Sequence, residues 1–251
     1  MRRNKYNGIF AYKCDIGKIR KTNEDQVMGF VNFSNDVLLF VADGMGGHRK
    51  GEFASGTIKE FLERDFKSKD KFFSIFNAYF WLVKEVKAIN KFIFRTQDFD
   101  ENYKGCGTTL CLALIHNDKI IILNAGDSRC YFLVDGKLIQ KTEDQTYVNY
   151  LLRSGQISSK EAETHPKKHY LINAIGLFPS VSFDINIYEY HGESIFLCSD
   201  GLYNNVDKKD IEATLNNKNT VDEKINSLVN LANFNGGSDN ISAILWESNN
   251  D

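Results

Sequence analysis

Three short segments of the sequence each place an aspartate beside glycine, serine or asparagine at the edge of an apolar run. They are residues 41–48 (VADGMGGH), 198–201 (CSDG) and 236–240 (GGSDN). Hard cations such as Mg²⁺ and Mn²⁺ bind carboxylate, carbonyl and water oxygens, and glycine lets the backbone approach an ion closely. If the fold brings Asp43, Asp200 and Asp239 together, their oxygens can hold a divalent cation. The sequence therefore predicts a metal site assembled from three distant parts of the chain.

Other interpretations of these residue types are weaker. A single Asp-Gly pair is most often a turn, so the prediction depends on the three aspartates taken together. The cysteines lack the close paired spacing of thiolate zinc sites, and most lie in apolar strand-like runs. We interpret all five as reduced core residues: Cys14, Cys106, Cys111, Cys130 and Cys198.

The aspartates lie where strands are expected to begin or end. Residues 38–42 (LLFVA) and 194–198 (SIFLC) are apolar runs of strand length, so Asp43 and Asp200 should emerge at strand ends. Asp239 should open a strand at 240–246. Further strands are expected at 9–14, 26–33, 108–115, 119–125, 129–134, 137–141 and 182–190, with hairpin turns at 117–118 and 135–136.

Apolar residues at three- and four-residue spacing predict helices near 52–66 and 72–94, and further helices are expected at 208–215 and 221–234. In the second helix we interpret one apolar stripe as the core-facing surface: Phe73, Phe76, Phe80, Val83 and Val86. Helices grouped between runs of antiparallel strands favour an α+β layered sandwich. No linker or repeat divides the chain, so residues 1–251 are expected to form one domain, with a polar excursion at about 142–180.

Composition and charge narrow the function classes. The 251 residues are 42% hydrophobic and 25% charged, which is typical of a globular protein with a sizeable core. The net charge of −2 gives no indication of a nucleic-acid partner. No signal peptide or membrane span is evident, because the longest apolar patch, at 72–83, is too short. We therefore expect a cytoplasmic location and no membrane partner.

Six landmarks in order along the chain resemble the metal-dependent protein serine/threonine phosphatases of type 2C, in their bacterial form. They are 17–25 (GKIRKTNED), 43–48 (DGMGGH), 107–109 (GTT), 126–129 (GDSR), 199–201 (SDG) and 237–240 (GSDN). The resemblance spans nearly the whole chain. It implies a four-layer α/β/β/α sandwich of two antiparallel sheets flanked by helix pairs, with a metal cleft at the sheet edge.

The resemblance also implies roles for individual residues. Asp43 resembles the ligand that bridges two Mn²⁺ or Mg²⁺ ions, with Gly44 offering its carbonyl oxygen. Asp200 and Asp239 resemble the other ligands of the first metal. Glu24 resembles an acidic group around the second metal. Asp127 resembles the residue that, with Asp200, binds a third, weaker metal.

Further residues resemble the groups that handle substrate and protons. Arg20 is similar to the arginine that grips phosphate with its planar guanidinium, and Asp25 to a residue that orients Arg20 or a metal-bound water. His48 is the expected general acid, or alternatively a loop histidine that only orders water. Arg129 is expected to tie loops together. His165 is expected to cap or pack beneath the excursion. The other histidines are interpreted as surface residues: His116, His169 and His191.

The excursion resembles the family's flap, but its sequence departs from the usual pattern. Asp144-Gln145-Thr146 stands where Asp-His-Ser is usual, and Asn173 stands where an arginine is frequent. Neither change removes an expected metal ligand. Both leave the substrate-contacting surface open.

The expected function is hydrolysis of phosphoserine and phosphothreonine on cytoplasmic proteins by a metal-activated water, without a covalent phosphoenzyme. Such an enzyme would oppose a serine/threonine kinase, with that kinase or its substrates as partners, and we expect a monomer. Two alternatives remain open from the sequence. One is a catalytically silent regulatory member, and the other is a small-molecule phosphohydrolase on the same scaffold.

Overall fold

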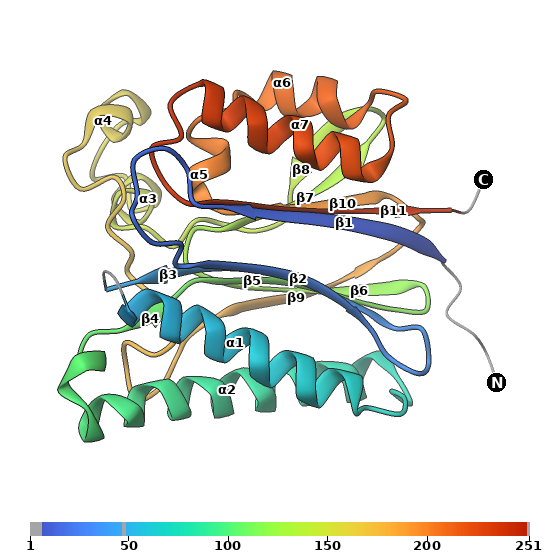
Figure 1. Cartoon of the computed structure of the whole chain (residues 1–251), viewed down its shortest axis with the longest axis horizontal. Coiled ribbons are helices and arrows are strands. Elements are labelled where there is room, and N and C mark those ends of the chain that lie inside the picture. Colours follow the sequence, from blue (N-terminus) through green and yellow to red (C-terminus); the bar gives the residue numbers. More distant parts are fainter. Residues whose placement is uncertain (1–6, 47–48, 250–251) are drawn as a thin grey trace.

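Two antiparallel β-sheets lie face to face between two layers of helices in the computed structural model, which describes residues 7–46 and 49–249 (Figure 1). The first sheet has the order β1 (Gly8–Asp15), β11 (Ile241–Ser248), β10 (Ser194–Cys198), β7 (Arg129–Val134) and β8 (Lys137–Gln140). The second has the order β2 (Asp25–Val31), β3 (Val37–Met45), β5 (Leu110–His116), β6 (Lys119–Ala125) and β9 (Asp184–Glu189), with β4 (Gly107–Thr108) paired to β3. The four-layer α+β sandwich is confirmed.

Helices cover the outer face of each sheet (Figure 1). Two long helices, α1 (Arg49–Lys67) and α2 (Ile75–Phe99), cover the second sheet, followed by the short η1 (Glu101–Tyr103). The first sheet is covered by α5 (Asp200–Tyr203), α6 (Lys208–Leu215) and α7 (Val221–Phe234). The flap contains α3 (Tyr147–Arg153) and α4 (Ser159–Thr164). Among the described residues, no helix combines the length and apolarity needed to cross a bilayer.

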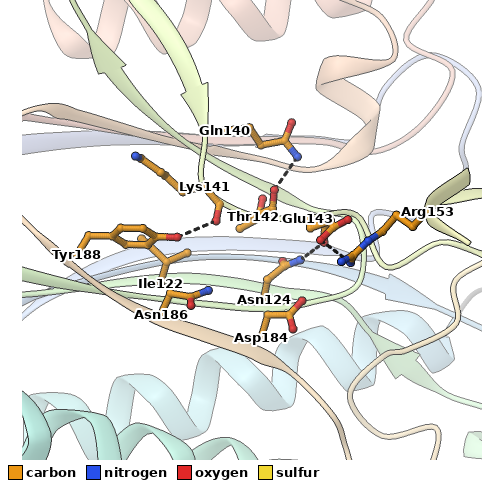
Figure 2. A pocket seen from close by; sticks show the side chains of 10 residues that line it. All are labelled: Ile122, Asn124, Gln140, Lys141, Thr142, Glu143, Arg153, Asp184, Asn186 and Tyr188. Carbon is orange, nitrogen blue, oxygen red and sulfur yellow. Dashed lines mark hydrogen bonds and ion pairs between the residues drawn. The ribbon is translucent and has the colours of Figure 1, made fainter. Parts of the chain in front are cut away.

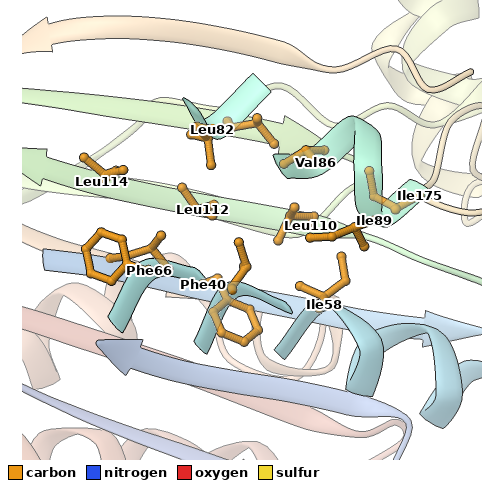
Figure 3. Packing of buried hydrophobic residues seen from close by; sticks show 14 of the residues in the cluster. Phe40, Ile58, Phe66, Leu82, Val86, Ile89, Leu110, Leu112, Leu114 and Ile175 are labelled. Atoms are coloured by element: carbon orange, nitrogen blue, oxygen red, sulfur yellow. The ribbon is translucent and has the colours of Figure 1, made fainter. Parts of the chain in front are cut away.

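Continuous apolar strands arise because both faces of each sheet are covered. Successive side chains of a strand point to opposite faces. In β3, Leu38 and Phe40 therefore pack beneath α1 and α2, as Figure 3 shows for Phe40. Leu39 and Val41 pack between the two sheets. A third core lies between the first sheet and α5, α6 and α7.

The residues found at hairpin turns and helix caps are types that favour those positions. The backbone has positive φ at Asn117, Asp135 and Gly136, as tight turns between antiparallel strands require. Ser74 caps α2 by accepting a hydrogen bond from the backbone NH of Asn77, and Thr220 forms a capping box with Glu223 at the start of α7.

The predicted core-facing stripe of α2 is wrong for its three phenylalanines. Phe73, Phe76 and Phe80 are 79%, 64% and 66% exposed. Val83 is half-buried, and Val86 is buried as expected. The helix packs on the sheet through a neighbouring stripe: Ile75, Ala78, Leu82, Val86, Ile89 and Ile93. Both stripes have helical spacing, so periodicity alone could not identify the packed one.

Candidate metal centre

A cleft of about 270 Å³ opens at the ends of strands from both sheets. It brings together every residue expected to bind metal: Glu24, Asp43, Gly44, Asp127, Asp200 and Asp239. Arg20, the expected phosphate ligand, also lines it. These residues come from segments separated by up to 219 positions, so the convergence is a property of the fold.

The alternation of side chains in the strands explains why the carboxylates point into this cleft. Leu39 and Val41 of β3 face the gap between the sheets, and Asp43 continues the same face beyond the apolar core. Asp25 lies opposite Asp43 in the register of β2 with β3, on the same side as the inter-sheet residue Val27.

Asp25 connects the two sheets at the base of the cleft. It is 1% exposed, and its Oδ2 accepts a 2.8 Å hydrogen bond from the hydroxyl of Ser199, which follows β10. The same hydroxyl accepts a bond from the backbone NH of Ser242 in β11. The expected role of Asp25 in orienting Arg20 or a metal-bound water stays a prediction, and its Oδ2 bonds to the hydroxyl of Ser199.

Four buried or half-buried carboxyls in and beneath the cleft make one another difficult to ionise. Burial, followed by repulsion from Asp25, Asp200, Asp127 and Asp239, raises the pKa of Asp43 well above its ordinary value. Burial and repulsion from Asp200 raise the pKa of Asp127 to about 8. The pKa of Asp25 is raised to about 7, and that of Asp200 is also raised, in both cases by burial first and neighbouring carboxylates second.

Arg20 supplies a positive charge at the rim. Its Nη2 lies 2.7 Å from Oδ2 of Asp239, and the two side chains are 54% and 32% exposed. An exposed ion pair of this kind contributes little stability, and the exposed guanidinium retains donors that can reach a ligand in the cleft.

Gly44 is required by close packing as well as by any role of its carbonyl. A Cβ built on Gly44 would lie 2.3 Å from the carbonyl oxygen of Gly51 in α1 and 2.5 Å from that of Glu24. The backbone NH of Gly44 also donates to the Glu24 carbonyl. The tight approach fixes Glu24 beside Asp43.

The flap is anchored to the strands that carry Asp127 by the residues that depart from the family pattern. Gln145 Oε1 accepts hydrogen bonds from the backbone NH of Gly126 at 3.0 Å and from Asn173 Nδ2 at 2.7 Å. Arg129 binds both carboxylate oxygens of Asp144 and lies 3.6 Å from the Tyr203 ring centroid. The expected loop-tying role of Arg129 agrees with these contacts.

The histidines divide differently from the expectation. His116 is buried and its Nδ1 lies 2.8 Å from Oδ1 of Asp36, so its assignment to the surface was wrong. His169 is exposed as expected, yet it lines the cleft. Its place in the flap, which was expected beside the cleft, is the signal that could have identified it. His191 is exposed, and half-buried His165 accepts a bond from the Lys167 NH. His48 lies outside the described residues.

A larger hollow of about 510 Å³ lies beside the flap, between β8 and β9 (Figure 2). Its polar groups are largely bonded to one another: Arg153 pairs with Glu143, and Asn124 donates to the Glu143 carbonyl. Both carboxylates that line it have partners, since Glu143 pairs with Arg153 and Asp184 accepts a hydrogen bond from Gln145. The larger group of carboxylates lies in the smaller cleft.

The donor set of the cleft suits divalent cations. Among residues 7–46 and 49–249, no three Asp, Glu, His or Cys side chains are oriented so that they already surround a common ion position. However, the buried Oδ1 atoms of Asp25 and Asp200 have no hydrogen-bond partner. Mutual repulsion also raises the pKa of these carboxyls, and Arg20 offsets it only at the rim. Hard oxygen donors under such repulsion fit Mg²⁺ or Mn²⁺.

The sequence and fold match known phosphatases. Residues 20–245 match the family "Protein phosphatase 2C". Serine/threonine phosphatase stp of Listeria welshimeri is 37% identical over 239 residues, covering 95% of both chains. Among solved structures, the S. agalactiae serine/threonine phosphatase superposes with a TM-score of 0.91 at 33% identity, covering 96% of this chain and 99% of that one. Stp1 from Staphylococcus aureus has a TM-score of 0.90 at 32% identity, with 98% and 97% covered.

Proposed function

The chain belongs to the protein phosphatase 2C family and is a protein serine/threonine phosphatase, and from this premise we propose a metal-dependent hydrolysis at the cleft described above. The proposed substrates are phosphoserine and phosphothreonine on proteins of the cytoplasm, in opposition to a serine/threonine kinase. The observation that carries the proposal is the convergence of Asp43, Asp200 and Asp239 in one cleft with Arg20 at its rim.

The proposed ligands of two Mn²⁺ or Mg²⁺ ions are Asp43, Asp200, Asp239, Glu24 and the Gly44 carbonyl, with Asp127 and Asp200 at a third, weaker site. When bound, such ions supply positive charge beside the phosphoryl oxygens and lower the pKa of a water molecule. Asp25 and Ser199 fix the two sheets relative to each other beneath these carboxylates.

Arg20 is the proposed phosphate ligand. Its guanidinium offers several planar N–H donors, which match two phosphoryl oxygens and offset their negative charge. The 2.7 Å pair with Asp239 holds the guanidinium at the rim. Because Arg20 is exposed and Asp239 only half-buried, Arg20 can exchange this contact for substrate phosphate, which would leave the Asp239 carboxylate available to hold a metal.

Direct attack by water is proposed because the described residues lining the cleft include no cysteine. Burial raises the pKa of Cys14 and Cys106 to about 11, and that of Cys111 and Cys198 further still. Neutral thiols are poor nucleophiles. The departing alkoxide benefits from a proton donor, for which histidine is the usual candidate, and His48 is the proposed donor.

The test is hydrolysis of p-nitrophenyl phosphate and of a phosphothreonine peptide by the purified chain, with Mn²⁺ and with chelator. We expect chelation to abolish turnover, and Asp43→Asn or Asp239→Asn to lower kcat by several orders of magnitude while preserving the circular dichroism spectrum. Asp207→Asn, an exposed aspartate before α6 with no side-chain cap bond, is the matched control. Metal-dependent turnover that survives in Asp43→Asn would contradict the assignment. Turnover of small phosphate esters without the peptide would favour a small-molecule phosphohydrolase.

A further inference from the structure

The solvent-facing side of α2 combines exposed aromatic rings with a row of cations. We call this surface the α2 outer face, and it consists of Phe73, Phe76, Phe80, Lys84, Lys87, Lys91 and Arg95. Its three phenylalanines are 79%, 64% and 66% exposed, and its four basic residues are all exposed. Single exposed apolar residues are common, but a cluster of rings on one helix face indicates an interaction site.

The helical repeat places Phe76, Phe80 and the four basic residues on one side of α2, because they are three or four residues apart. Phe73 precedes the helix, next to its N-cap Ser74. The opposite side carries Leu82, Val86 and Ile89, which pack against the sheet (Figure 3). The three rings of the outer face are therefore turned toward solvent, and Phe80 meets only the edge of its neighbour Tyr79 in the ring contacts of the described residues.

The charge of this region is opposite in sign to that of the whole protein. Residues 68–99 contain six Lys or Arg and three Asp or Glu, although the complete chain has a net charge of −2. One of the three acids, Glu85, is only half-exposed and hydrogen-bonds to Asp65 of α1. Five of the basic residues are exposed, against two of the acids, Asp70 and Asp98, so the exposed charge of this segment is positive.

A neighbouring loop extends the aromatic end of this face. The hydroxyl of Ser34, in the turn between β2 and β3, donates a 2.7 Å hydrogen bond to the carbonyl of Asp70, just before α2. This contact brings the 82% exposed Phe33 close to the start of the helix. Lys71 lies over the Phe73 ring, with its Nζ 4.9 Å from the ring centroid.

The position of α2 leaves the cleft free when the outer face is covered. In Figure 1, α2 forms the outermost layer on one side of the sandwich and begins at the end away from α3 and α4. The rings lie at that starting end. A flat surface laid against α2 would contact the rings and the row of cations while the cleft between the sheets stays open.

We propose that the α2 outer face docks this phosphatase onto a membrane surface containing anionic lipids. Phenylalanine rings partition into the boundary between headgroups and acyl chains, and lysines beside them attract anionic headgroups. None of the seven residues of the outer face lines either hollow described above, and a helix face that combines exposed rings with lysines suits a deformable anionic lipid surface. The binding is peripheral, since no described helix can cross the bilayer.

This inference goes beyond the proposed catalytic function and does not depend on it. It departs from the sequence-based expectation of no membrane partner. That expectation used the net charge of the whole chain and the lack of an apolar span, neither of which detects a local surface.

The experiment is co-sedimentation of the full chain with vesicles of phosphatidylglycerol and phosphatidylcholine, compared with phosphatidylcholine alone. We expect binding only to the anionic vesicles, with affinity falling as salt rises. A lysine near an anionic surface contributes about fivefold in affinity, so Lys84→Glu/Lys87→Glu/Lys91→Glu should weaken binding about 100-fold or more. Phe73→Ser/Phe76→Ser should weaken it roughly tenfold.

Matched controls place the same changes on other surfaces. Lys160→Glu/Lys209→Glu/Lys218→Glu has the same net charge, and Phe178→Ser/Phe234→Ser removes two rings that are 52% and 82% exposed. Both controls should bind anionic vesicles more tightly than the corresponding outer-face variants. Turnover of p-nitrophenyl phosphate should remain unchanged in the outer-face variants, since none of these residues lines the cleft.

Two results would overturn the proposal. One is a wild-type chain that stays in the supernatant with anionic vesicles at low salt, which would leave an acidic protein as the partner of the face. The other is equal binding by the outer-face variants and their matched controls, which would show that membrane affinity resides elsewhere.

Discussion

The chemistry of the cleft depends on which side chains point into it, and the alternation of side chains along each strand sets that direction. The sequence was sufficient to predict Asp43, Asp200 and Asp239, because each follows or precedes an apolar run beside glycine or serine. It could not predict that Asp25 bonds to Ser199 or that Arg20 pairs with Asp239. Those contacts depend on which residues of two separate sheets face each other, and local spacing contains no such information.

The histidines provide a test at this scale. His48→Ala should lower turnover of a phosphothreonine peptide, whose leaving group is poor, at least tenfold more than turnover of p-nitrophenyl phosphate, because only a poor leaving group needs a proton donor. His169→Ala should affect both substrates equally, since His169 is exposed at the cleft. Steady-state kinetics on both substrates decides between the residues. The reverse pattern would make His169 the donor.

Whole helices and strands were predicted well where periodicity and turn residues agree. The strands, the two hairpin turns and the four longer helices lie within a few residues of their expected positions. The prediction of which side of α2 faces the core was wrong. The helix has apolar residues on two sides, and only packing against the sheet selects one of them. The position of the helix was therefore predicted correctly, but the exposure of one of its apolar stripes was not.

Ionisation of Glu85, where α2 meets α1, should lower the stability of the fold as pH rises, and one substitution should remove this effect. Burial, a hydrogen bond with Asp65 and repulsion from it raise the pKa of Glu85 from 4.5 to about 7. A raised carboxyl pKa contributes stability at low pH that is lost as pH rises through the folded-state value. Glu85→Gln keeps the hydrogen bond without ionising, so its Tm should exceed that of wild type by a few degrees above pH 7, and by less in acid.

Differential scanning calorimetry across this pH range measures the difference. Glu60→Gln, an exposed glutamate of α1, is the control and should leave the Tm difference flat with pH. A Glu85→Gln variant that loses stability at alkaline pH would show that the carboxylate, rather than the carboxylic acid, is the form held at this junction.

At the scale of the molecule, the four-layer sandwich follows from strands that are apolar on both faces, because such strands require cover on each side. The family resemblance supplied the order of layers, which the fold confirms. The hydrogen bonds that hold the flap could not be predicted from the resemblance. Gln145 and Asn173 replace the usual residues there, and they bond to each other and to the Gly126 backbone.

Metal should stabilise the whole chain. Asp25 and Asp127, with pKa values of about 7 and about 8, hold protons in the folded state that the unfolded chain releases. The stability of the chelated protein should therefore fall as pH rises through these values. Mn²⁺ at about 100-fold above its Kd should add about 2.7 kcal/mol, or roughly 5–10 °C in Tm, on the alkaline side.

Thermal denaturation with Mn²⁺ and with chelator tests this expectation. Asp43→Asn should be more stable than wild type in chelator, because one repelling charge is gone, and should gain less from Mn²⁺. An equal gain in both proteins would place the stabilising ion outside the cleft.

The placement of the carboxylates at the seam of the sandwich has a mechanical consequence. Asp43 lies within β3 of one sheet, which continues to Met45, while Asp200 and Asp239 flank strands of the other. A dication bound by all three would link the two sheets at this end, in addition to hydrogen bonds such as those of Ser199 with Asp25 and of Glu24 with Asn240. Depriving a cell of manganese would then weaken the contact between the two sheets as well as abolish the proposed activity. Limited proteolysis should detect this weakening first.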